Sequence, residues 1–217
     1  MKFERLEYLF GKEGLNKLKN ATVAVIGIGG VGGTAANCLV RSGIGNLIIC
    51  DYDYIEETNI NRQIIANNNN IGSMKTDVLE QMLLDINPEC KIRKISSPYN
   101  ENIFTNDNIY VIDAIDDIKS KILLIKNCLQ KNITFISAMG AGKKTEVDKI
   151  KITKLSKTSY DPIAKILRKE FRNTDFPVVS STEKPKIAKL GSYMPVTSTF
   201  GLYLSDYIIK EILVKGE

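Results

Sequence analysis

The hydrophobic and polar positions of this 217-residue chain follow two periods. Compact runs of β-branched residues, such as 21–27 and 109–114, are typical of strands buried on both faces of a parallel sheet. Longer stretches with an apolar residue every three or four positions are typical of helices. The pattern predicts strands at 21–27, 46–51, 91–95, 109–114, 134–138 and 149–153, and helices at 12–20, 34–42, 74–86, 119–131, 161–172 and 191–214.

Two polar segments interrupt this alternation. Residues 53–73 are rich in asparagine and read as a long functional loop, and residues 173–190 read as a polar, mobile segment. The alternation of strands and helices predicts an α/β fold, Rossmann-like, with a mixed, mainly parallel central sheet flanked by helices. We expect one domain over 1–217. Its half at 1–140 would bind a nucleotide, and its half at 141–217 would contact the substrate and a second subunit.

The composition excludes several classes of protein. No apolar run reaches the roughly 18 residues needed to span a bilayer, and the charged N-terminus does not resemble a secretory signal. The four cysteines form no C-x-x-C pair, which argues against a zinc ribbon or a disulfide framework and favours reduced thiols in the cytoplasm. The chain has no histidine, so an acid–base step would have to use other groups.

Charge is distributed unevenly along the chain. Residues 1–140 carry 15 Lys and Arg against 16 Asp and Glu, whereas residues 141–217 carry 15 against 9. A basic second half suits a polyanionic partner such as RNA, although a solvated basic surface explains the same count. The basic residues considered for contacts with an RNA backbone are Lys143, Lys144, Lys154, Lys157, Arg168, Lys169 and Arg172.

A glycine turn, G-I-G-G-V-G, follows the first predicted strand and precedes a predicted helix. Gly27 permits a tight turn, Gly29 and Gly30 let backbone amides approach phosphate oxygens, and Gly32 lets the helix pack near the sheet. In this strand–turn–helix setting the motif predicts nucleotide binding. Asp51 ends the next strand, 24 residues after Gly27, where a carboxylate can accept hydrogen bonds from ribose hydroxyls. Up to this point NAD and ATP fit equally well.

The segments that follow favour ATP. The string N-I-N-R-Q comes after Asp51 and Asp53, Lys75 lies 13 residues beyond Arg62, and the strand at 109–114 ends on D-A-I-D-D. A dehydrogenase has no use for an arginine and a lysine near the phosphates opposite an acidic strand end. An enzyme that adenylates a carboxylate does, because it must neutralise a triphosphate while pyrophosphate leaves.

These motifs resemble the ubiquitin-activating-like adenylyltransferases, of the ThiF/MoeB/HesA type. The resemblance implies catalytic roles for Arg62, Lys75 and Asp116, with Asp116 on the Mg²⁺ side, and for Arg5, which would be supplied to the site of a dimer partner. It implies that ATP contacts come from Gly27, Gly29, Gly30, Gly32, Asp51, Asp53, Asn59, Arg62, Gln63 and Lys75.

The second half of the chain narrows the resemblance to one branch of these enzymes. The string L-S-K-T-S-Y-D-P-I-A-K-I-L-R at 155–168 is similar to the tRNA threonylcarbamoyladenosine dehydratase branch of these enzymes. That branch implies ATP-dependent cyclisation of threonylcarbamoyladenosine in tRNA, through adenylation of the threonyl carboxylate and release of AMP and pyrophosphate. It also implies a homodimer. There is no cysteine after Cys128, which agrees with a reaction that needs no acyl-thioester.

Three other functions remain as alternatives. One is an adenylyltransferase that activates the C-terminus of a ThiS/MoaD-like sulfur-carrier protein. Another is an NAD-linked oxidoreductase, which would leave Arg62, Lys75 and Asp116 without roles. The last is a non-catalytic nucleotide-binding scaffold. The sequence also leaves open whether a monovalent cation binds and whether a sulfur-transfer protein is a partner.

Overall fold

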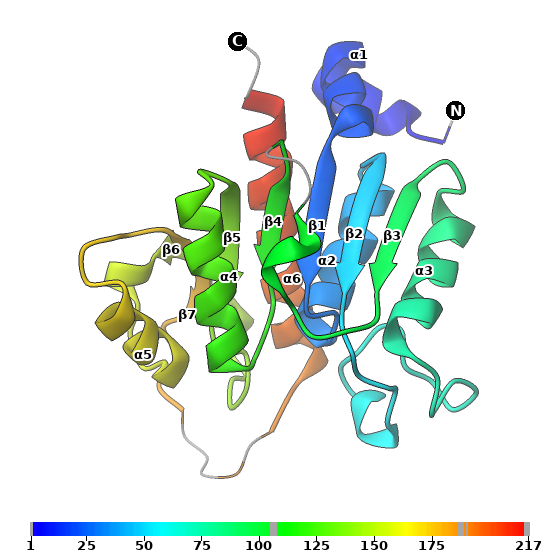
Figure 1. Cartoon of the computed structure of the whole chain (residues 1–217). Coiled ribbons are helices and arrows are strands. Elements are labelled where there is room, and N and C mark those ends of the chain that lie inside the picture. The colour runs from blue at the N-terminus through cyan, green and yellow to red at the C-terminus, as the bar shows by residue number, and fades with distance from the viewer. Residues whose placement is uncertain (1, 105–107, 186–188, 190, 215–217) are drawn as a thin grey trace.

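The computed structural model describes residues 2–104, 108–185, 189 and 191–214. Its centre is a sheet of seven strands in the order β3-β2-β1-β4-β5-β7-β6 (Figure 1). All neighbouring strands are parallel except β6 and β7, which pair antiparallel. The predicted α/β fold with a mixed, mainly parallel sheet is therefore confirmed.

Strands and helices alternate along most of the chain. The strands are β1 (Thr22–Ile26), β2 (Asn46–Cys50), β3 (Lys91–Ile95), β4 (Tyr110–Asp113), β5 (Thr134–Ala138), β6 (Ile150–Lys154) and β7 (Pro177–Ser181). The α-helices are α1 (Glu4–Asn20), α2 (Gly30–Arg41), α3 (Lys75–Ile86), α4 (Ile118–Gln130), α5 (Pro162–Glu170) and α6 (Met194–Val214). Single 3-10 turns are η1 (Glu57–Asn59), η2 (Glu101–Ile103), η3 (Val147–Lys149) and η4 (Leu155–Lys157).

Alternate residues of each central strand enter two separate hydrophobic clusters, one on each face of the sheet. In β4, Tyr110 and Ile112 join the cluster formed with α2, α3 and α6, whereas Val111 joins the cluster formed with α4 and α5. Figure 1 shows the corresponding layers, with α4 and α5 on one side of the sheet and α2 and α6 on the other. Burial on both faces explains why these strands have continuous apolar sequences.

The long helix α6 packs directly against α2, and Gly201 makes this approach possible. A Cβ at that position would lie 2.5 Å from the carbonyl oxygen of Val31, in α2. The C-terminal half of the chain thus covers the helix that begins at the glycine turn.

Among the described residues, no helix combines the length and the apolar character that a membrane span requires.

The structure differs from the sequence prediction mainly at three elements. Helix α2 begins at Gly30, inside the glycine turn, and not at the predicted residue 34. The first helix is longer than the predicted 12–20, because α1 begins at Glu4 and continues across a kink at Gly11, whose φ is +70°. The segment 173–190, expected to be polar and mobile, contains the buried strand β7 between β5 and β6. Residues 186–188 and 190 of that segment lie outside the described residues.

A fully buried ion pair joins the end of β4 to α4. The ammonium of Lys121 donates to Oδ2 of Asp113 at 2.8 Å and to the carbonyl of Ile115 at 2.8 Å. The same carboxylate oxygen accepts the hydroxyl of Ser137 at 2.6 Å, and Oδ1 accepts the amide of Ile115 at 3.1 Å. Because both charges are removed from water, each depends on the other for compensation.

We predict that Lys121→Met lowers the free energy of unfolding by about 3–5 kcal/mol, because it leaves the Asp113 carboxylate buried without its cation. The measurement is urea denaturation followed by circular dichroism. The control is Lys210→Met, which breaks an exposed pair with Asp206 and should change stability by about 0.5 kcal/mol or less. Equal stability of the two variants would contradict a compensated buried pair.

Candidate active site

A cleft of about 880 Å³ opens at the carboxyl ends of the parallel strands. It is lined by the segments that follow β1, β2, β4 and β5, and by residues at the start of α5. The strand order reverses between β1 and β4, because β1 is followed by its neighbour β2 whereas β4 is followed by β5 on the other side. Ligands of open α/β sheets bind at such a switch point, so the topology and the cleft indicate the same place.

The glycine turn closes tightly over the end of β1. Gly27 has a φ of +83°, and a Cβ there would lie 2.6 Å from the carbonyl oxygen of Ala114. A Cβ at Gly32 would lie 1.8 Å from the carbonyl oxygen of Gly27, so the first turn of α2 rests against the strand end. Both positions therefore require glycine for reasons internal to the protein.

The two central glycines have different surroundings. A Cβ at Gly30 would lie 2.7 Å from the carbonyl oxygen of Arg62, so this glycine is needed for contact with the loop after β2. A Cβ at Gly29 would have only the Gln63 amide nitrogen near it, at 3.8 Å. Both residues line the cleft at the N-terminus of α2, where amides without intrahelical partners favour an anion.

Asp51 braces the glycine turn. Its buried carboxylate accepts the amide of Ile28 at 2.8 Å through Oδ2 and the amide of Asp53 at 2.9 Å through Oδ1. Each oxygen of a carboxylate can accept more than one hydrogen bond, so both retain capacity for ribose hydroxyls. Asp51 thus lies where the sequence predicted and also orders the loops on either side of it.

Lys75 begins α3 and lies on the cleft wall with 5% of its surface exposed. Its ammonium is 2.7 Å from Oδ2 of Asp53, whose side chain is about half exposed. A cation in the first turn of a helix is unfavourably placed relative to the helix dipole, and the Asp53 carboxylate offsets this. The pair leaves a buried cation beside the cleft with a partner that solvent and ligands can reach.

The loop after β2 brings Asn59, Arg62 and Gln63 to the cleft. Asn59 is buried, and its Oδ1 accepts the Glu56 amide at 3.2 Å, which stabilises η1. The guanidinium of Arg62 donates to the carbonyl of Thr58 at 2.7 Å. Gln63 is buried, and its Oε1 has no hydrogen-bond partner among the residues described.

The three aspartates at and after the end of β4 lie in different environments. Asp113 is buried in its pair with Lys121, outside the cleft lining. Asp117 lines the cleft but caps α4, accepting the Ser120 amide at 2.8 Å, and this hydrogen bond lowers the pKa of its carboxyl. Asp116 is exposed and lines the cleft. Of the three, Asp116 is the carboxylate best placed to meet a metal ion on a nucleotide.

Arg5 lies away from this cleft. It is exposed in the first turns of α1, which leads into the start of β1 at the opposite end of the sheet (Figure 1). The neighbouring Phe3 approaches Gly43, in the connection before β2. Arg5 therefore does not belong to the cleft of its own chain, and its assignment to a partner's site stays a prediction.

The second half of the chain supplies a side of the cleft that residue-by-residue reasoning missed. The turn at 140–144 and the start of α5 line it, and Asp161 connects the two. The Asp161 carboxylate accepts the amides of Gly140 at 2.8 Å and Ala164 at 2.9 Å. The signal for this N-cap was present in the sequence, since Asp161 directly precedes a proline at the first position of α5.

The prediction that Lys144 contacts an RNA backbone is wrong. Lys144 has only 3% of its surface exposed and lines the cleft, so it is not available to a phosphate backbone on the surface. Lys154, Lys157, Lys169 and Arg172 are exposed, and Lys143 and Arg168 are half-buried.

Comparison with known proteins places the chain among enzymes of this architecture. The ThiF family model matches residues 4–217. The tRNA threonylcarbamoyladenosine dehydratase of Bacillus subtilis is 44% identical over 86% of this chain and 77% of its own length, and that of Haemophilus influenzae is 36% identical over 99% and 94%. The crystal structure of the Escherichia coli tRNA N6-threonylcarbamoyladenosine dehydratase in complex with ATP superposes with a TM-score of 0.93, at 32% identity over 99% of this chain and 94% of that one. The chain belongs to the ThiF family.

Proposed function

We propose that this chain is an ATP-dependent tRNA threonylcarbamoyladenosine dehydratase. The observation that carries the proposal is the nearly full-length likeness to dehydratases, one of them crystallised with ATP, combined with a cleft at the topological switch point. The cleft contains the glycine turn and Lys75 on one side and the turn at 140–144 on the other. It therefore offers a place for a nucleotide and a place for an acceptor next to it.

The proposed chemistry has two steps. The free carboxylate of the threonylcarbamoyl group attacks the α-phosphorus of ATP, and pyrophosphate leaves. A group of the same modification then attacks the activated carbonyl, so that a ring closes and AMP is expelled. The net change in the nucleoside is the loss of one water. Because the nucleophile of the second step is already tethered, the protein contributes mainly orientation and compensation of charge.

The residues of the nucleotide side have distinct proposed roles. The amides at Gly29 and Gly30 and the N-terminus of α2 hold phosphate oxygens, and Asp51 accepts the ribose hydroxyls. Lys75 and Arg62 stabilise the charge that develops on the phosphates. Asp53 keeps Lys75 in place before the nucleotide arrives. Asn59 supports the loop that carries Arg62, and the unpaired Oε1 of Gln63 offers a buried acceptor to the ligand.

We propose that Mg²⁺ enters with the nucleotide and meets Asp116. The described residues contain no group of three or more His, Cys, Asp or Glu that could hold a metal ion by themselves. Mg²⁺ usually keeps several waters and binds through one or two carboxylates together with substrate phosphates, so one exposed cleft carboxylate fits this mode. The ion would supply charge neutralisation at the phosphates.

The exposed basic residues of the second half are the proposed contacts for the tRNA backbone. Lys157 belongs to η4, and Lys165 and Lys169 to α5, the helix whose N-terminus lines the cleft. A basic surface beside the acceptor side of the cleft would hold the tRNA while the modified base enters.

A cytoplasmic location is part of the proposal, since the substrate is a tRNA and the four cysteines are unpaired.

We propose a homodimer in which Arg5 completes the partner's site. Tyr8 and Leu9 of α1 expose about three quarters of their surface, and Leu202 and Tyr203 of α6 are also exposed. Exposed aromatic and aliphatic side chains of this kind are typical of a subunit interface. Because α1 and α6 contact each other, one interface could include both.

The first test is turnover. Wild-type protein incubated with ATP, Mg²⁺ and tRNA bearing threonylcarbamoyladenosine should convert that nucleoside to a product lighter by one water, with release of AMP and pyrophosphate. The measurement is mass spectrometry of the digested tRNA. Release of pyrophosphate only when a carrier protein ending in Gly-Gly is added, with the nucleoside unchanged, would instead support the sulfur-carrier alternative.

Removing either cleft cation should slow the reaction. We expect Arg62→Ala and Lys75→Met each to lower kcat by about 100- to 1000-fold, as is typical when one stabilising group is lost from a transition state. Lys75→Met should remain folded because Asp53 is half exposed and stays solvated. The control is Lys94→Met, which removes a cation at the edge strand β3, paired with Asp77 and Glu80 outside the cleft. A wild-type rate in Arg62→Ala would argue for a non-catalytic protein.

A subunit-mixing experiment tests the role of Arg5. Arg5→Ala and Lys75→Met proteins should each be nearly inactive alone. Mixed in equal amounts and allowed to exchange subunits, they should recover about a quarter of the wild-type activity, because half of the dimers are mixed and each of these has one intact site. Activity that stays absent in verified mixed dimers would mean that Arg5 does not act across the interface.

A further inference from the structure

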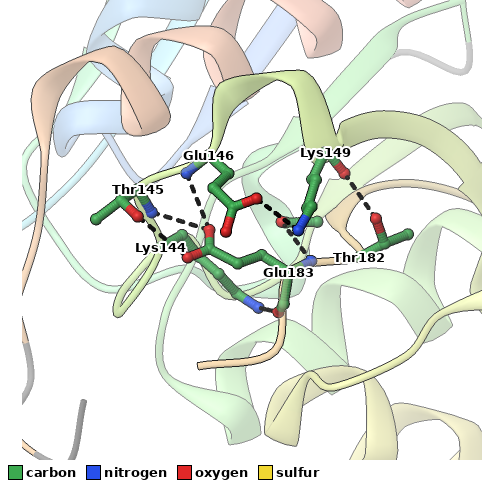
Figure 2. Close-up of polar contacts among 7 residues, drawn as sticks. Lys144, Thr145, Glu146, Lys149, Thr182 and Glu183 are labelled. Atoms are coloured by element: carbon green, nitrogen blue, oxygen red, sulfur yellow. Dashed lines mark hydrogen bonds and ion pairs between the residues drawn. The ribbon is translucent and has the colours of Figure 1, made fainter. Parts of the chain in front are cut away.

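Lys144 is a cation on the acceptor side of the cleft for which the mechanism above has no role. It belongs to the turn that follows β5, with 3% of its surface exposed, and it lines the cleft. Its ammonium donates to the main-chain carbonyl of Glu183, the second residue after β7 (Figure 2). A lysine is rarely buried to this extent without an ion pair.

The side chain of Glu183 fixes the turn that carries Lys144. Its Oε2 accepts the amides of Thr145 at 2.9 Å and Glu146 at 3.0 Å, and its Oε1 accepts the Thr145 hydroxyl at 3.2 Å (Figure 2). Burial raises the pKa of this carboxyl, but the hydrogen bonds from Glu146 and Thr145 outweigh it and hold the pKa below its usual value. Glu183 is therefore a carboxylate whose oxygens are committed to the turn.

Lys144 forms no close ion pair with the charged groups described around it. The carboxylates that face it are Asp161 at the start of α5 and Glu183 after β7, and the neighbouring cation in the same turn is Lys143. Asp161 is occupied by the amides of Gly140 and Ala164, and Glu183 by the turn. Among the described residues the ammonium has one hydrogen-bond partner, the Glu183 carbonyl, although it carries three donors. Burial lowers the pKa of Lys144, opposed by these two charges.

The sheet places Lys144 on the side from which an acceptor must approach. The glycine turn and Asp51 follow β1 and β2, on one side of the switch point. Lys144 and Glu183 follow β5 and β7, on the other side. A nucleotide that lies on the glycine turn leaves the segments after β5 to line the space from which a carboxylate reaches its α-phosphorus.

We propose that Lys144 binds the carboxylate of the threonylcarbamoyl group and orients it toward the nucleotide, with Glu183 as the positioning residue. This inference rests on the proposed dehydratase function. A carboxylate supplied by the substrate would give this ammonium a charged partner in addition to the Glu183 carbonyl. The carboxylate must be ionised to attack phosphorus, and a cation with fixed geometry selects that form.

The test compares two forms of one tRNA in the absence of ATP, so that no turnover occurs. One form carries threonylcarbamoyladenosine and the other the unmodified adenosine. The wild type should bind the modified form at least about tenfold more tightly, and Lys144→Met should abolish that preference. Its affinity for ATP alone, measured by calorimetry, should stay within about twofold of the wild type. The control is Lys149→Met, which removes a cation from the same segment, paired with Glu146 outside the cleft, and should keep the preference.

A pH series on Glu183→Gln separates positioning from folding. Glutamine retains an oxygen for the two amides but removes a negative charge that favours protonated Lys144. The preference for modified tRNA depends on the protonated lysine, so it is lost as pH rises through the lysine pKa. Without the Glu183 charge that pKa falls further, and the alkaline midpoint of the preference should move to lower pH. A purely structural Glu183 would weaken binding at all pH values without moving the midpoint.

The possible results are distinguishable. If wild-type protein cyclises the nucleoside but Lys144→Met keeps the preference for modified tRNA, the inference about Lys144 is overturned and the proposed function stands. Loss of ATP affinity with the preference intact would assign Lys144 to the phosphates and also overturn it. If the wild type neither distinguishes the two tRNAs nor cyclises the nucleoside, the proposed function fails first. If Lys144→Met does not fold, the pH series on Glu183→Gln decides. An alkaline midpoint that does not shift in that variant would overturn the inference.

Discussion

The contact between the glycine turn and the strand ends around it is the constraint on which the nucleotide side depends. The first turn of α2 comes so close to β1 that a Cβ at Gly32 would overlap the carbonyl oxygen of Gly27. This approach directs the amides at the start of α2 toward the cleft. Asp51 then connects the turn to the next loop through the amides of Ile28 and Asp53. The carboxylate proposed to hold ribose is thus also a support for the phosphate cradle.

The opposite side of the cleft is built by the same means, with acidic side chains that accept backbone amides. Asp161 connects the turn after β5 to α5, and Glu183 connects that turn to the end of β7. Such charge-assisted hydrogen bonds are stronger than neutral ones and order segments that have no regular structure. Deeper in the sheet, the Asp113–Lys121 pair fixes the segment before Asp116. The segments after β1, β2, β4 and β5 at the cleft are therefore each held by a buried carboxylate.

Local spacing allowed the sequence to predict the fold class, the glycine turn and the position of Asp51, and the family resemblance added Arg62, Lys75 and Asp116, which line the same cleft. Elements and residues whose environment depends on contacts distant in the chain could not be predicted in this way. Strand β7 was missed because its short apolar run adjoins a proline and polar residues, and only its place between β5 and β6 buries it. Nothing local distinguishes Lys144 from Lys143, since the carbonyl that receives Lys144 is 39 residues away. The place of Arg5 depends on a second subunit.

The two buried lysines of the cleft are compensated differently, and the difference suits different ligands. Lys75 is paired with Asp53, a half-exposed carboxylate that water can solvate when a triphosphate competes for the ammonium. Lys144 is held by a carbonyl, while the nearby carboxylates are committed to backbone amides. A substrate carboxylate therefore has no side chain to displace there. In a chain without histidine, catalysis by fixed charges is consistent with a reaction whose nucleophiles are both supplied by the substrate.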